Sequence, residues 1–361
     1  MRTPKFISNS ILTVLKLFLS VKEKPVSKIE TPGKVLIVRQ HNQFGDLLAS
    51  LSLLRAVKET FPGVFLAVIA SPQNYYALTQ NKFVDQLFVF DKKKLFTLSY
   101  LKKLKRFLKQ NFDLSITPST VSISLTSLLL MRFSDAKMRI GPNSLNGKQN
   151  KYRFLFDRRV DLDWTKKPDA HVSDFGLDIV RPFGIDTEDF STEINIKKEN
   201  LDVAKDFIKK TGINTGEKLV GLHIGAGKPK NRWSLDKYIE LVKSLNNEFR
   251  LKFYLTGSDS DLEELNYFSA HCSINAAKFI NKKIPDVAAL ISLSDLFITN
   301  DTGIMHVAGA TNTPQISIFG PTNPFNWAPV GQNKYFIRKS DLIDDVRVED
   351  VFTLCKKILG N

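Results

Sequence analysis

The feature that most constrains the fold of this chain is an alternation of short apolar runs with helical segments, which occurs twice. In the first half, the β-rich runs are residues 34–39, 64–70, 86–90 and 112–118. In the second half, the runs are residues 218–224, 251–257, 295–299 and 314–320. Strands that alternate with helices in this way are typical of parallel, doubly wound sheets. The sequence therefore predicts an α/β protein with two such sheets.

The same pattern predicts how the chain is divided. We expect an amphipathic segment over 1–30, a Rossmann-like domain over 31–185 and a second one over 186–361. Residues 141–169 are charged and rich in turn formers, so we interpret them as a loop, with a helix over 170–184 behind it. The helices of the second half are expected at about 234–247, 259–268, 285–292, 303–310 and, closing the chain, 348–359. Ligands of such sheets bind beyond the carboxyl ends of the strands, so the residues there are the candidate site.

The charge of the chain favours an anionic partner. The formal net charge is +15 over 361 residues, which suits nucleic acid, acidic lipid headgroups or phosphorylated substrates. A surplus of solubilising lysine explains it equally well. The sequence shows no nucleic-acid module, and its 27 phenylalanines form no stacking stripe, which argues against nucleic acid. The two cysteines lack ligand or redox spacing and fit a reduced, intracellular setting.

The N-terminal segment has helical spacing of apolar residues at Ile7, Ile11, Val14, Leu15 and Phe18. No apolar run in the chain reaches the ~18 residues that a membrane span needs. A signal peptide is opposed by a lysine inside the apolar part and by the lack of a small-residue cleavage site. Two interpretations remain, a helix docked on the protein's own surface and an amphipathic helix at a membrane interface, which we favour.

The exit of the first strand carries a candidate carboxylate, within "VLIVRQHNQFGDLLAS". Gly45 allows a tight turn, and Asp46 lies in the first turn of the following helix. Asp46 either caps that helix or accepts a proton from a substrate hydroxyl, and the residues alone do not separate these roles. No G-x-G-x-x-G follows this strand, so a dinucleotide fingerprint is absent.

The matching exit in the second half, "GLHIGAGKPKNRWSLDKY", indicates a phosphate site. Its small residues let backbone approach a ligand closely, and they are Gly225, Ala226 and Gly227. The cations that follow are Lys228, Lys230 and Arg232. Ser234 is the expected N-cap of the next helix. Small residues followed by cations favour diphosphate binding over a merely solvated basic loop.

A third exit, "TNDTGIMHVAGATNTPQISIFGPT", places polar residues at a helix start. Asp301 or Thr302 is expected to cap a helix that begins near Gly303, whose free N–H groups then attract an anion. His306 lies one turn further and is either structural or a brace for the loop. No metal-ligand motif occurs in the sequence, so a protein-held metal has no support.

These three blocks resemble glycosyltransferase family 9, the ADP-heptose:lipopolysaccharide heptosyltransferases. The most specific parts are D-T-G-x-x-H followed by F-G-P-T, and the Gly-Asp pair after the first strand. The resemblance implies a GT-B fold, with two Rossmann-like domains facing a cleft. It also implies an inverting sugar transfer that uses neither a metal nor a cofactor, and the expected nucleotide-sugar donor is ADP-heptose.

The resemblance assigns roles to individual residues. It maps the catalytic base onto Asp46 and places Gly45 and Arg39 on the acceptor side. It maps contacts to the sugar donor onto Gly225, Ala226, Lys230, Arg232, Asp259, Asp301, Thr302, Gly303 and His306. One departure concerns the lysine that the family usually carries before the Arg-Trp or His-Trp pair, because this chain has Asn231 there.

The partners that the resemblance implies are a nucleotide-sugar and an anionic lipopolysaccharide or lipid-linked glycan, with no role for nucleic acid. The implied location is cytoplasmic and peripheral, on the inner face of the inner membrane of a Gram-negative bacterium. The basic segment 98–110 and the N-terminal segment are then expected to hold the enzyme at that membrane. Two alternatives stay open: a family member that uses another nucleotide-sugar for O-antigen or capsule glycan, and an inactive, basic glycan-binding protein.

Overall fold

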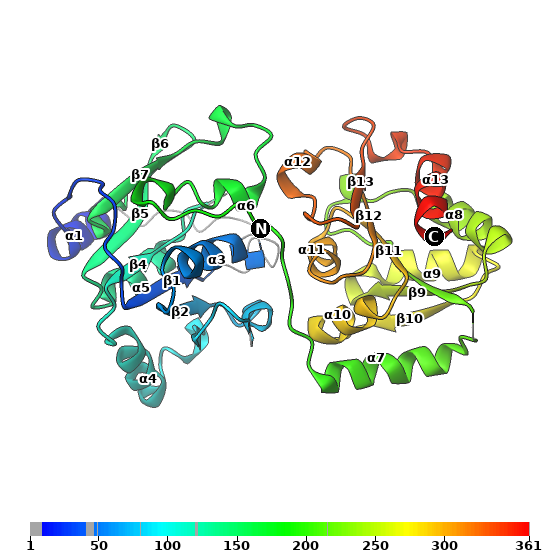
Figure 1. The fold of residues 1–361 in the computed structure, drawn as a ribbon, viewed down its shortest axis with the longest axis horizontal. Helices are drawn as coiled ribbons and strands as arrows, with labels where there is room; N and C mark the ends of the chain where they lie inside the picture. Colours follow the sequence, from blue (N-terminus) through cyan, green and yellow to red (C-terminus); the bar gives the residue numbers. More distant parts are fainter. Residues whose placement is uncertain are drawn as a thin grey trace. The chain divides into compact units, whose positions relative to one another are not determined.

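The computed structural model describes residues 9–40, 47–48, 50–79, 81–119, 122–214 and 216–360. It divides the chain into two compact units, Met1–Phe190 and Ser191–Asn361 (Figure 1). The boundary predicted from the sequence follows residue 185. Each unit contains one sheet with helices on both of its faces, and each is described here by itself.

Unit 1 is built on a mainly parallel sheet. Its strands are β1 (Lys34–Arg39), β2 (Phe65–Ala70), β3 (Gln86–Val89), β4 (Leu114–Ile116), β5 (Met138–Leu145), β6 (Lys148–Gln149) and β7 (Arg158–Leu162). Their order is β3-β2-β1-β4-β5-β6, and β7 pairs with β5. The four strands predicted from the apolar runs of this half are confirmed as β1 to β4. The strands β1, β2 and β4 form the buried centre of the sheet, whereas β3 is a half-exposed edge strand.

The prediction of a loop over 141–169 is wrong. The strand β5 pairs antiparallel with β6 and parallel with β7, so this charged segment extends the sheet. The turn between β5 and β6 is Asn146-Gly147, with φ angles of 51° and 72°. Asn-Gly with positive φ at both residues is the preferred two-residue hairpin turn. The strands escaped prediction because they are half-exposed and lack a continuous apolar run.

Helices cover both faces of the sheet in unit 1 (Figure 1). They are α1 (Asn9–Leu19), α3 (Leu51–Thr60), α4 (Leu98–Leu108), α5 (Leu125–Phe133) and α6 (Val172–Phe175). The helices α1, α4 and α5 pack on one apolar cluster with β1 and β2, whereas α3 contacts α6. The helix predicted over 170–184 is mostly wrong: α6 stops before Gly176, and Pro182 lies in a separate 3₁₀ turn. Glycine and proline interrupt helices, which accounts for the break.

The helix α1 docks on unit 1. Leu12, Leu15 and Leu19 pack against the same apolar cluster as α4, and the Ser20 turn that follows ends the helix. For this side of α1, the contacts support the interpretation that the helix docks on the protein's own surface. Among the helices that the structure describes, none combines the length and apolar character needed to span a bilayer.

Unit 2 is built on a fully parallel sheet. Its strands are β8 (Lys218–His223), β9 (Leu251–Gly257), β10 (Ala276–Ile280), β11 (Leu296–Asn300), β12 (Gln315–Ile318) and β13 (Lys334–Ile337). Their order is β10-β9-β8-β11-β12-β13, so the order reverses between β8 and β11. The packing at β8 demands a glycine, because a Cβ on Gly221 would lie 2.3 Å from the ring of Tyr254. The strands β8, β9, β11 and β12 confirm the predicted runs, whereas the half-exposed β10 and β13 were missed.

Helices sandwich the second sheet. They are α7 (Lys198–Thr211), α8 (Leu235–Glu248), α9 (Leu262–His271), α10 (Ile284–Ser292), α11 (Gly303–Gly309), α12 (Pro324–Trp327) and α13 (Val348–Leu359). One face of the sheet carries α8, α9 and α13 around a shared core. The other face carries α7, whose Phe207 contacts Tyr254 and Phe279, and α10, which packs on α7. Strand order and layers match the Rossmann arrangement, whose ligands bind where the strand order reverses.

Candidate functional site

The exits of β8 and β11 meet at the point where the strand order of unit 2 reverses. The segment after β8 runs through Gly225 and the 3₁₀ turn Pro229–Asn231, and the segment after β11 leads directly into α11. Both segments follow strands that pair in parallel, so they leave the sheet at the same edge. This is the place where open α/β sheets hold ligands.

Asn300 joins these two exits and is fully buried. Its Nδ2 donates to the carbonyl oxygens of Ile224 and Gly225, at 3.0 and 3.1 Å. Its Oδ1 accepts from the backbone N–H of Trp233 at 3.1 Å and from the hydroxyl of Tyr238 at 3.0 Å. Asn300 therefore fixes the path of the β8 exit from the end of β11. This role was not predicted from the sequence, where its signal is a polar residue at the end of a buried strand.

A second contact between the exits joins Asn231 to Asp301. The Nδ2 of Asn231 donates to Oδ2 of Asp301 at 2.8 Å, and the same nitrogen lies 3.4 Å from the Asp301 carbonyl oxygen. Burial raises the pKa of the Asp301 carboxyl above its usual range, while a hydrogen bond from Thr322 and the charge of Lys228 oppose this rise. The two exits are thus held together by an amide and a carboxylate.

The start of α11 differs from the prediction in one respect. Thr302 occupies the N-cap position, as expected, but its side chain makes no capping hydrogen bond, and Asp301 bonds to Asn231 instead. The buried Oγ1 of Thr302 has no hydrogen-bond partner among the described residues. The helix has only seven residues, so its dipole is a small part of any anion site here.

Gly303 follows Thr302 and is exposed. A Cβ on Gly303 would meet no atom of the described chain within 4 Å, and the residue does not adopt a positive φ. Packing and backbone conformation therefore do not account for this glycine. Gly227 is equally open, whereas a Cβ on Gly225 would lie 2.2 Å from Oδ1 of Asp261.

The basic residues of the β8 exit fall into two groups. Lys228 and Lys230 are exposed at the 3₁₀ turn, and Ala226 beside them is half-buried. Arg232 instead forms an ion pair with Glu264 of α9, whose side chain is mostly buried. A guanidinium held by a buried carboxylate is less available to a ligand than an exposed ammonium. The positive charge available to a ligand at this exit thus comes from the two lysines.

The remaining residues predicted for this site lie around its edge. Asp259 is exposed after β9, and its Oδ1 accepts from Nδ2 of Asn281 at 2.7 Å. His306 is half-buried on α11 with its ring edge-on to Trp327, at 6.5 Å between centroids. Ser234 takes the N-cap position of α8 without a capping bond from its side chain.

The far end of α11 is held by Lys334 of β13. Its Nζ donates to the carbonyl oxygens of Ala308, Thr311 and Thr313, at 3.1, 2.7 and 2.6 Å. Burial lowers the pKa of Lys334 to about 8. Ala308 lies in the last turn of α11, and Thr311 and Thr313 lie in the loop that follows the helix. Lys334 therefore ties the end of α11 and this loop to β13.

A buried histidine also lies beside the β8 exit. His223 is 7% exposed, and its Nδ1 lies 3.1 Å from the carbonyl oxygen of Thr256. The hydroxyl oxygen of Thr256 lies at the same distance of 3.1 Å from Nδ1, so the end of β9 can hold the ring in either tautomer. Burial lowers the pKa of His223 against a smaller opposing effect of Asp261, which favours the neutral imidazole. No sequence motif predicted a role for this residue.

The candidate carboxylate of unit 1 lies outside the described residues. Residues 41–46 are not described, and they include Gly45 and Asp46. Arg39, at the end of β1, is 4% exposed, and its guanidinium donates to the carbonyl oxygen of Pro118 at 3.4 Å. This contact joins the exits of β1 and β4, between which the strand order of unit 1 reverses.

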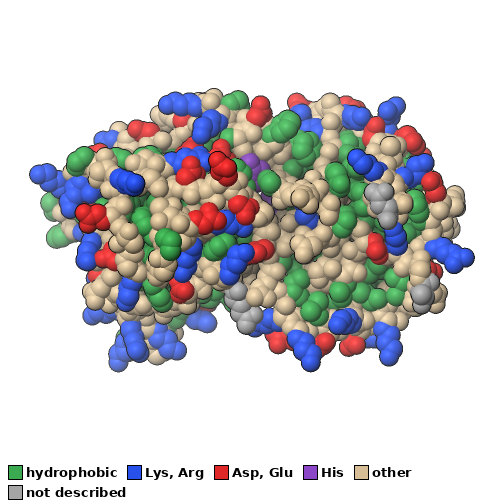
Figure 2. All heavy atoms as spheres, viewed as in Figure 1, with side chains coloured by type: hydrophobic (Ala, Val, Ile, Leu, Met, Phe, Trp, Pro, Cys, Tyr) green, Lys and Arg blue, Asp and Glu red, His purple; other side chains and the backbone are tan. Residues whose placement is uncertain are grey.

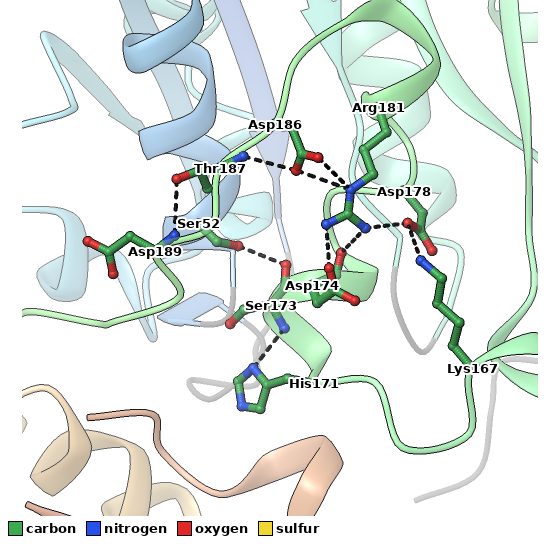
Figure 3. A network of polar contacts seen from close by, with 10 residues as sticks. All are labelled: Ser52, Lys167, His171, Ser173, Asp174, Asp178, Arg181, Asp186, Thr187 and Asp189. Carbon is green, nitrogen blue, oxygen red and sulfur yellow. Dashed lines mark hydrogen bonds and ion pairs between the residues drawn. The ribbon is translucent and has the colours of Figure 1, made fainter. Parts of the chain in front are cut away.

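A polar network braces the helix that follows this exit (Figure 3). The hydroxyl of Ser52 on α3 donates to the carbonyl oxygen of Ser173 on α6 at 2.9 Å. Behind α6, the guanidinium of Arg181 bonds to three carboxylates, those of Asp174, Asp178 and Asp186. Burial works against the charge of Arg181, but the three hydrogen-bonded carboxylates outweigh it and raise the pKa. The last segment of unit 1 is thereby fixed against α3.

The comparison with protein families decides the classification. The profile of glycosyltransferase family 9 (heptosyltransferase) matches residues 101–352. The chain belongs to this family. It is therefore a glycosyltransferase, and the resemblance stated from the sequence motifs is confirmed.

Curated relatives agree with the family 9 classification. The chain is 22% identical over 298 residues to lipopolysaccharide heptosyltransferase 3 of Escherichia coli, covering 80% of this chain and 84% of that protein. It is 24% identical over 315 residues to lipooligosaccharide heptosyltransferase 2 of Haemophilus influenzae, covering 81% of this chain and 85% of the relative.

Solved structures show that the fold is shared with other family 9 proteins. A family 9 glycosyl transferase from Veillonella parvula superposes with a TM-score of 0.78 at 18% identity, over 92% of this chain and 99% of that one. The E. coli ADP-heptose lipopolysaccharide heptosyltransferase II gives 0.72 at 19% identity, over 91% and 98% of the two chains. The predicted GT-B fold class is confirmed.

Proposed function

We propose that this family 9 enzyme transfers L-glycero-D-manno-heptose from ADP-heptose to a lipopolysaccharide inner-core or related glycan acceptor. The names of its curated relatives support the sugar and the acceptor class. The observation that carries the proposal is the meeting of the β8 and β11 exits through Asn231 and Asp301, where the strand order reverses. A nucleotide-sugar bound there lies at the usual ligand position of such a sheet.

The diphosphate of the sugar donor is proposed to bind at the start of α11. Lys228 and Lys230 supply exposed positive charge beside it. Gly303 and Gly227 present backbone without a side chain where the protein's own packing does not require glycine. Thr302 contributes a hydroxyl that has no hydrogen-bond partner within the described chain. Together these residues offer the positive charge, hydrogen-bond donors and open backbone that suit an anion.

The proposed reaction is a single displacement at the anomeric carbon of the sugar. Asp46 removes the proton from the acceptor hydroxyl as its oxygen attacks, and the nucleoside diphosphate leaves from the opposite face, so the configuration inverts. Negative charge grows on the leaving phosphate in the transition state. Lys228 and Lys230 are proposed to stabilise it in place of a metal ion. Pre-organised donors that meet developing negative charge contribute about 3–4 kcal/mol at oxyanion sites.

The variant Asp46→Asn tests the assigned base. We expect kcat to fall by about 10²–10⁴-fold, because the amide cannot accept the proton, while binding of the sugar donor is unchanged. The matched control is Glu59→Gln, which neutralises an exposed carboxylate of α3 in the same unit. Transfer by Asp46→Asn at nearly the wild-type rate shows that the base is another residue.

A second candidate function is transfer of another sugar to an O-antigen or capsule glycan. The observation in its favour is Asn231, which stands where the family usually carries lysine and so changes the charge beside Asp301. Titration calorimetry with ADP-heptose, GDP-sugars and UDP-sugars separates the two. Preferred binding of ADP-heptose supports the first function, and preferred binding of another nucleotide-sugar supports the second.

Two further experiments test whether the anomeric configuration inverts and whether the transfer proceeds without a metal ion. The anomeric configuration of the product, read by NMR, is expected to be opposite to that of the donor sugar. The rate is expected to be the same with and without EDTA. Retention of configuration contradicts the single displacement, and a rate restored only by added Mg²⁺ contradicts the proposed role of the lysines.

A further inference from the structure

A lysine-rich surface with exposed apolar side chains covers one edge of unit 1. It consists of residues 92–109 and is called the α4 surface here. Its cations are Lys92, Lys93, Lys94, Lys102, Lys103, Lys105, Arg106 and Lys109, all of them exposed. The sequence has no acidic residue from position 92 to 112. Figure 2 shows lysine and arginine side chains gathered at the lower left, over α4.

Apolar side chains project from the same surface. Phe96, between the three-lysine turn and α4, is 97% exposed, and Leu98 in the first turn of α4 is 76% exposed. Leu101, one turn further, is 39% exposed. Burying a side chain of the size of Phe or Leu is worth roughly 1.5–3 kcal/mol, so a partner that covers Phe96 and Leu98 gains several kcal/mol.

The inner side of α4 and the residues before it are packed against unit 1. The inner side of α4 buries Leu104, Phe107 and Leu108 in the core of unit 1. At its start, the hydroxyl of Tyr100 donates to the carbonyl oxygen of Val89 at 3.1 Å and accepts from the N–H of Asp91 at 2.7 Å. Phe96 and Leu98 are therefore held outward by a packed helix.

The helix α1 shows a second apolar outer side. Its inner side packs on the same cluster as α4, but Leu17 and Phe18 are 77% and 74% exposed, and Ile11 and Val14 are each 53% exposed. Both helices therefore cover the same face of the sheet in unit 1. Apolar side chains next to lysines are the composition of helices that lie in a membrane interface.

We propose that the α4 surface docks on an anionic lipid bilayer, with Phe96 and Leu98 inserted among the headgroups and the outer side of α1 as a further apolar contact. The eight cations attract anionic headgroups, at about 1 kcal/mol each near a membrane surface. Nucleic acid would bind the cations but leave Phe96 and Leu98 exposed to water. An acidic protein would pair with only some of the lysines. An anionic bilayer contacts both the cations and the exposed apolar side chains.

The test is flotation of the full chain with vesicles. Wild-type protein is expected to float with phosphatidylcholine–phosphatidylglycerol vesicles and not with phosphatidylcholine alone, and to lose part of its binding at high salt. Phe96→Ser is expected to lower the partition coefficient at least ~10-fold, because it removes the burial of one aromatic side chain. The matched control is Leu342→Ser, at a leucine of unit 2 that is 67% exposed.

The electrostatic part has a separate pair of variants. Lys102→Glu with Lys105→Glu is expected to reduce binding to anionic vesicles at least ~10-fold. Lys205→Glu with Lys209→Glu changes the net charge equally on the exposed side of α7 and is expected to bind like wild type. Absence of vesicle binding, equal effects of both pairs, or an unaffected Phe96→Ser overturns the proposal, as does binding to polynucleotide in place of vesicles.

This proposal does not depend on the one made for the sugar transfer. The α4 variants are expected to transfer sugar to a detergent-solubilised acceptor at the wild-type rate, because residues 92–109 have no assigned role in the chemistry. A chain that floats but transfers no heptose contradicts the proposed function alone. A chain that transfers heptose but does not float contradicts the membrane surface alone.

Discussion

The side-chain amide of Asn231 donates to the carboxylate of Asp301 at 2.8 Å, and this bond joins the exits of the two strands between which the sheet order of unit 2 reverses. The carboxylate is thereby held by a neutral group, and burial raises its pKa. The resemblance to family 9 implies a lysine at this place, where the chain has a neutral amide. A single substitution therefore tests whether positive charge at position 231 strengthens diphosphate binding.

We expect Asn231→Lys to raise the affinity for nucleoside diphosphates about 10-fold at low salt, because an ammonium next to Asp301 adds positive charge where the phosphates are proposed to lie. Titration of ADP, GDP and UDP by calorimetry measures this. The control is Asn247→Lys, which adds the same charge at an exposed position of α8. Equal affinities of the two variants would place the diphosphate elsewhere.

The glycines of unit 2 are expected to divide into two kinds when replaced by alanine. Gly303→Ala should leave thermal stability unchanged or slightly higher, because its Cβ meets no described atom, yet weaken nucleotide binding at least ~10-fold by crowding the ligand. Gly225→Ala should instead lower the thermal stability, because its Cβ collides with Asp261. Scanning calorimetry with and without ADP distinguishes the two. Unchanged ADP affinity in Gly303→Ala would remove that residue from the site.

Asn300→Ala should destabilise unit 2 by about 3–5 kcal/mol. The change leaves two carbonyls, the N–H of Trp233 and the hydroxyl of Tyr238 buried without their partner. Urea unfolding followed by circular dichroism measures the loss, and Asn247→Ala on the surface of α8 is the control. A loss below about 1 kcal/mol means that the two exits keep their path without this side chain.

The pH dependence of unit 1 is expected to include Asp113. A hydrogen bond from Lys137, followed by N–H groups of Lys34 and Gly33, lowers the pKa of Asp113. A lowered carboxyl pKa stabilises the fold above the unfolded value of about 4, and the contribution disappears as the pH falls through the folded value. Asp113→Asn should therefore reduce the unfolding free energy at pH 7 but leave it unchanged in strong acid.

Urea titrations of the two proteins across the acid range measure this difference. The exposed Asp202→Asn on α7 serves as the control, since it lies outside unit 1. A constant difference between wild type and Asp113→Asn at every pH would mean that the carboxylate acts by shape and hydrogen bonding alone.

The sequence predicted the centre of each sheet well because those strands are continuous apolar runs. The edge strands were harder, since β10 and β13 are half-exposed and show no such run. The hairpin of β5 and β6 was missed for another reason. Its Asn146-Gly147 turn was visible in the sequence, but the charged residues around it suggested a loop.

The sequence predicted where the candidate site lies in unit 2, but it predicted few of the contacts between the residues of the site. The motif residues of the β8 and β11 exits do lie together, as the parallel order of the strands requires. Motif spacing along the chain could not predict hydrogen-bond and ion-pair partners that come from distant segments. These include Glu264, which holds Arg232, and Asn281, which holds Asp259. The role of Asp46 stays a prediction, because this residue lies outside the described part of the chain.

The ammonium of Lys334 on β13 holds three carbonyls behind α11, although it comes well after the D-T-G-x-x-H signature in the chain. Genome surveys that classify family 9 proteins by that signature alone would retain a homologue that lacks this lysine. In such a homologue the carbonyl oxygens of Ala308, Thr311 and Thr313 need another donor. A match to the signature alone therefore does not show that the contacts behind this helix are present.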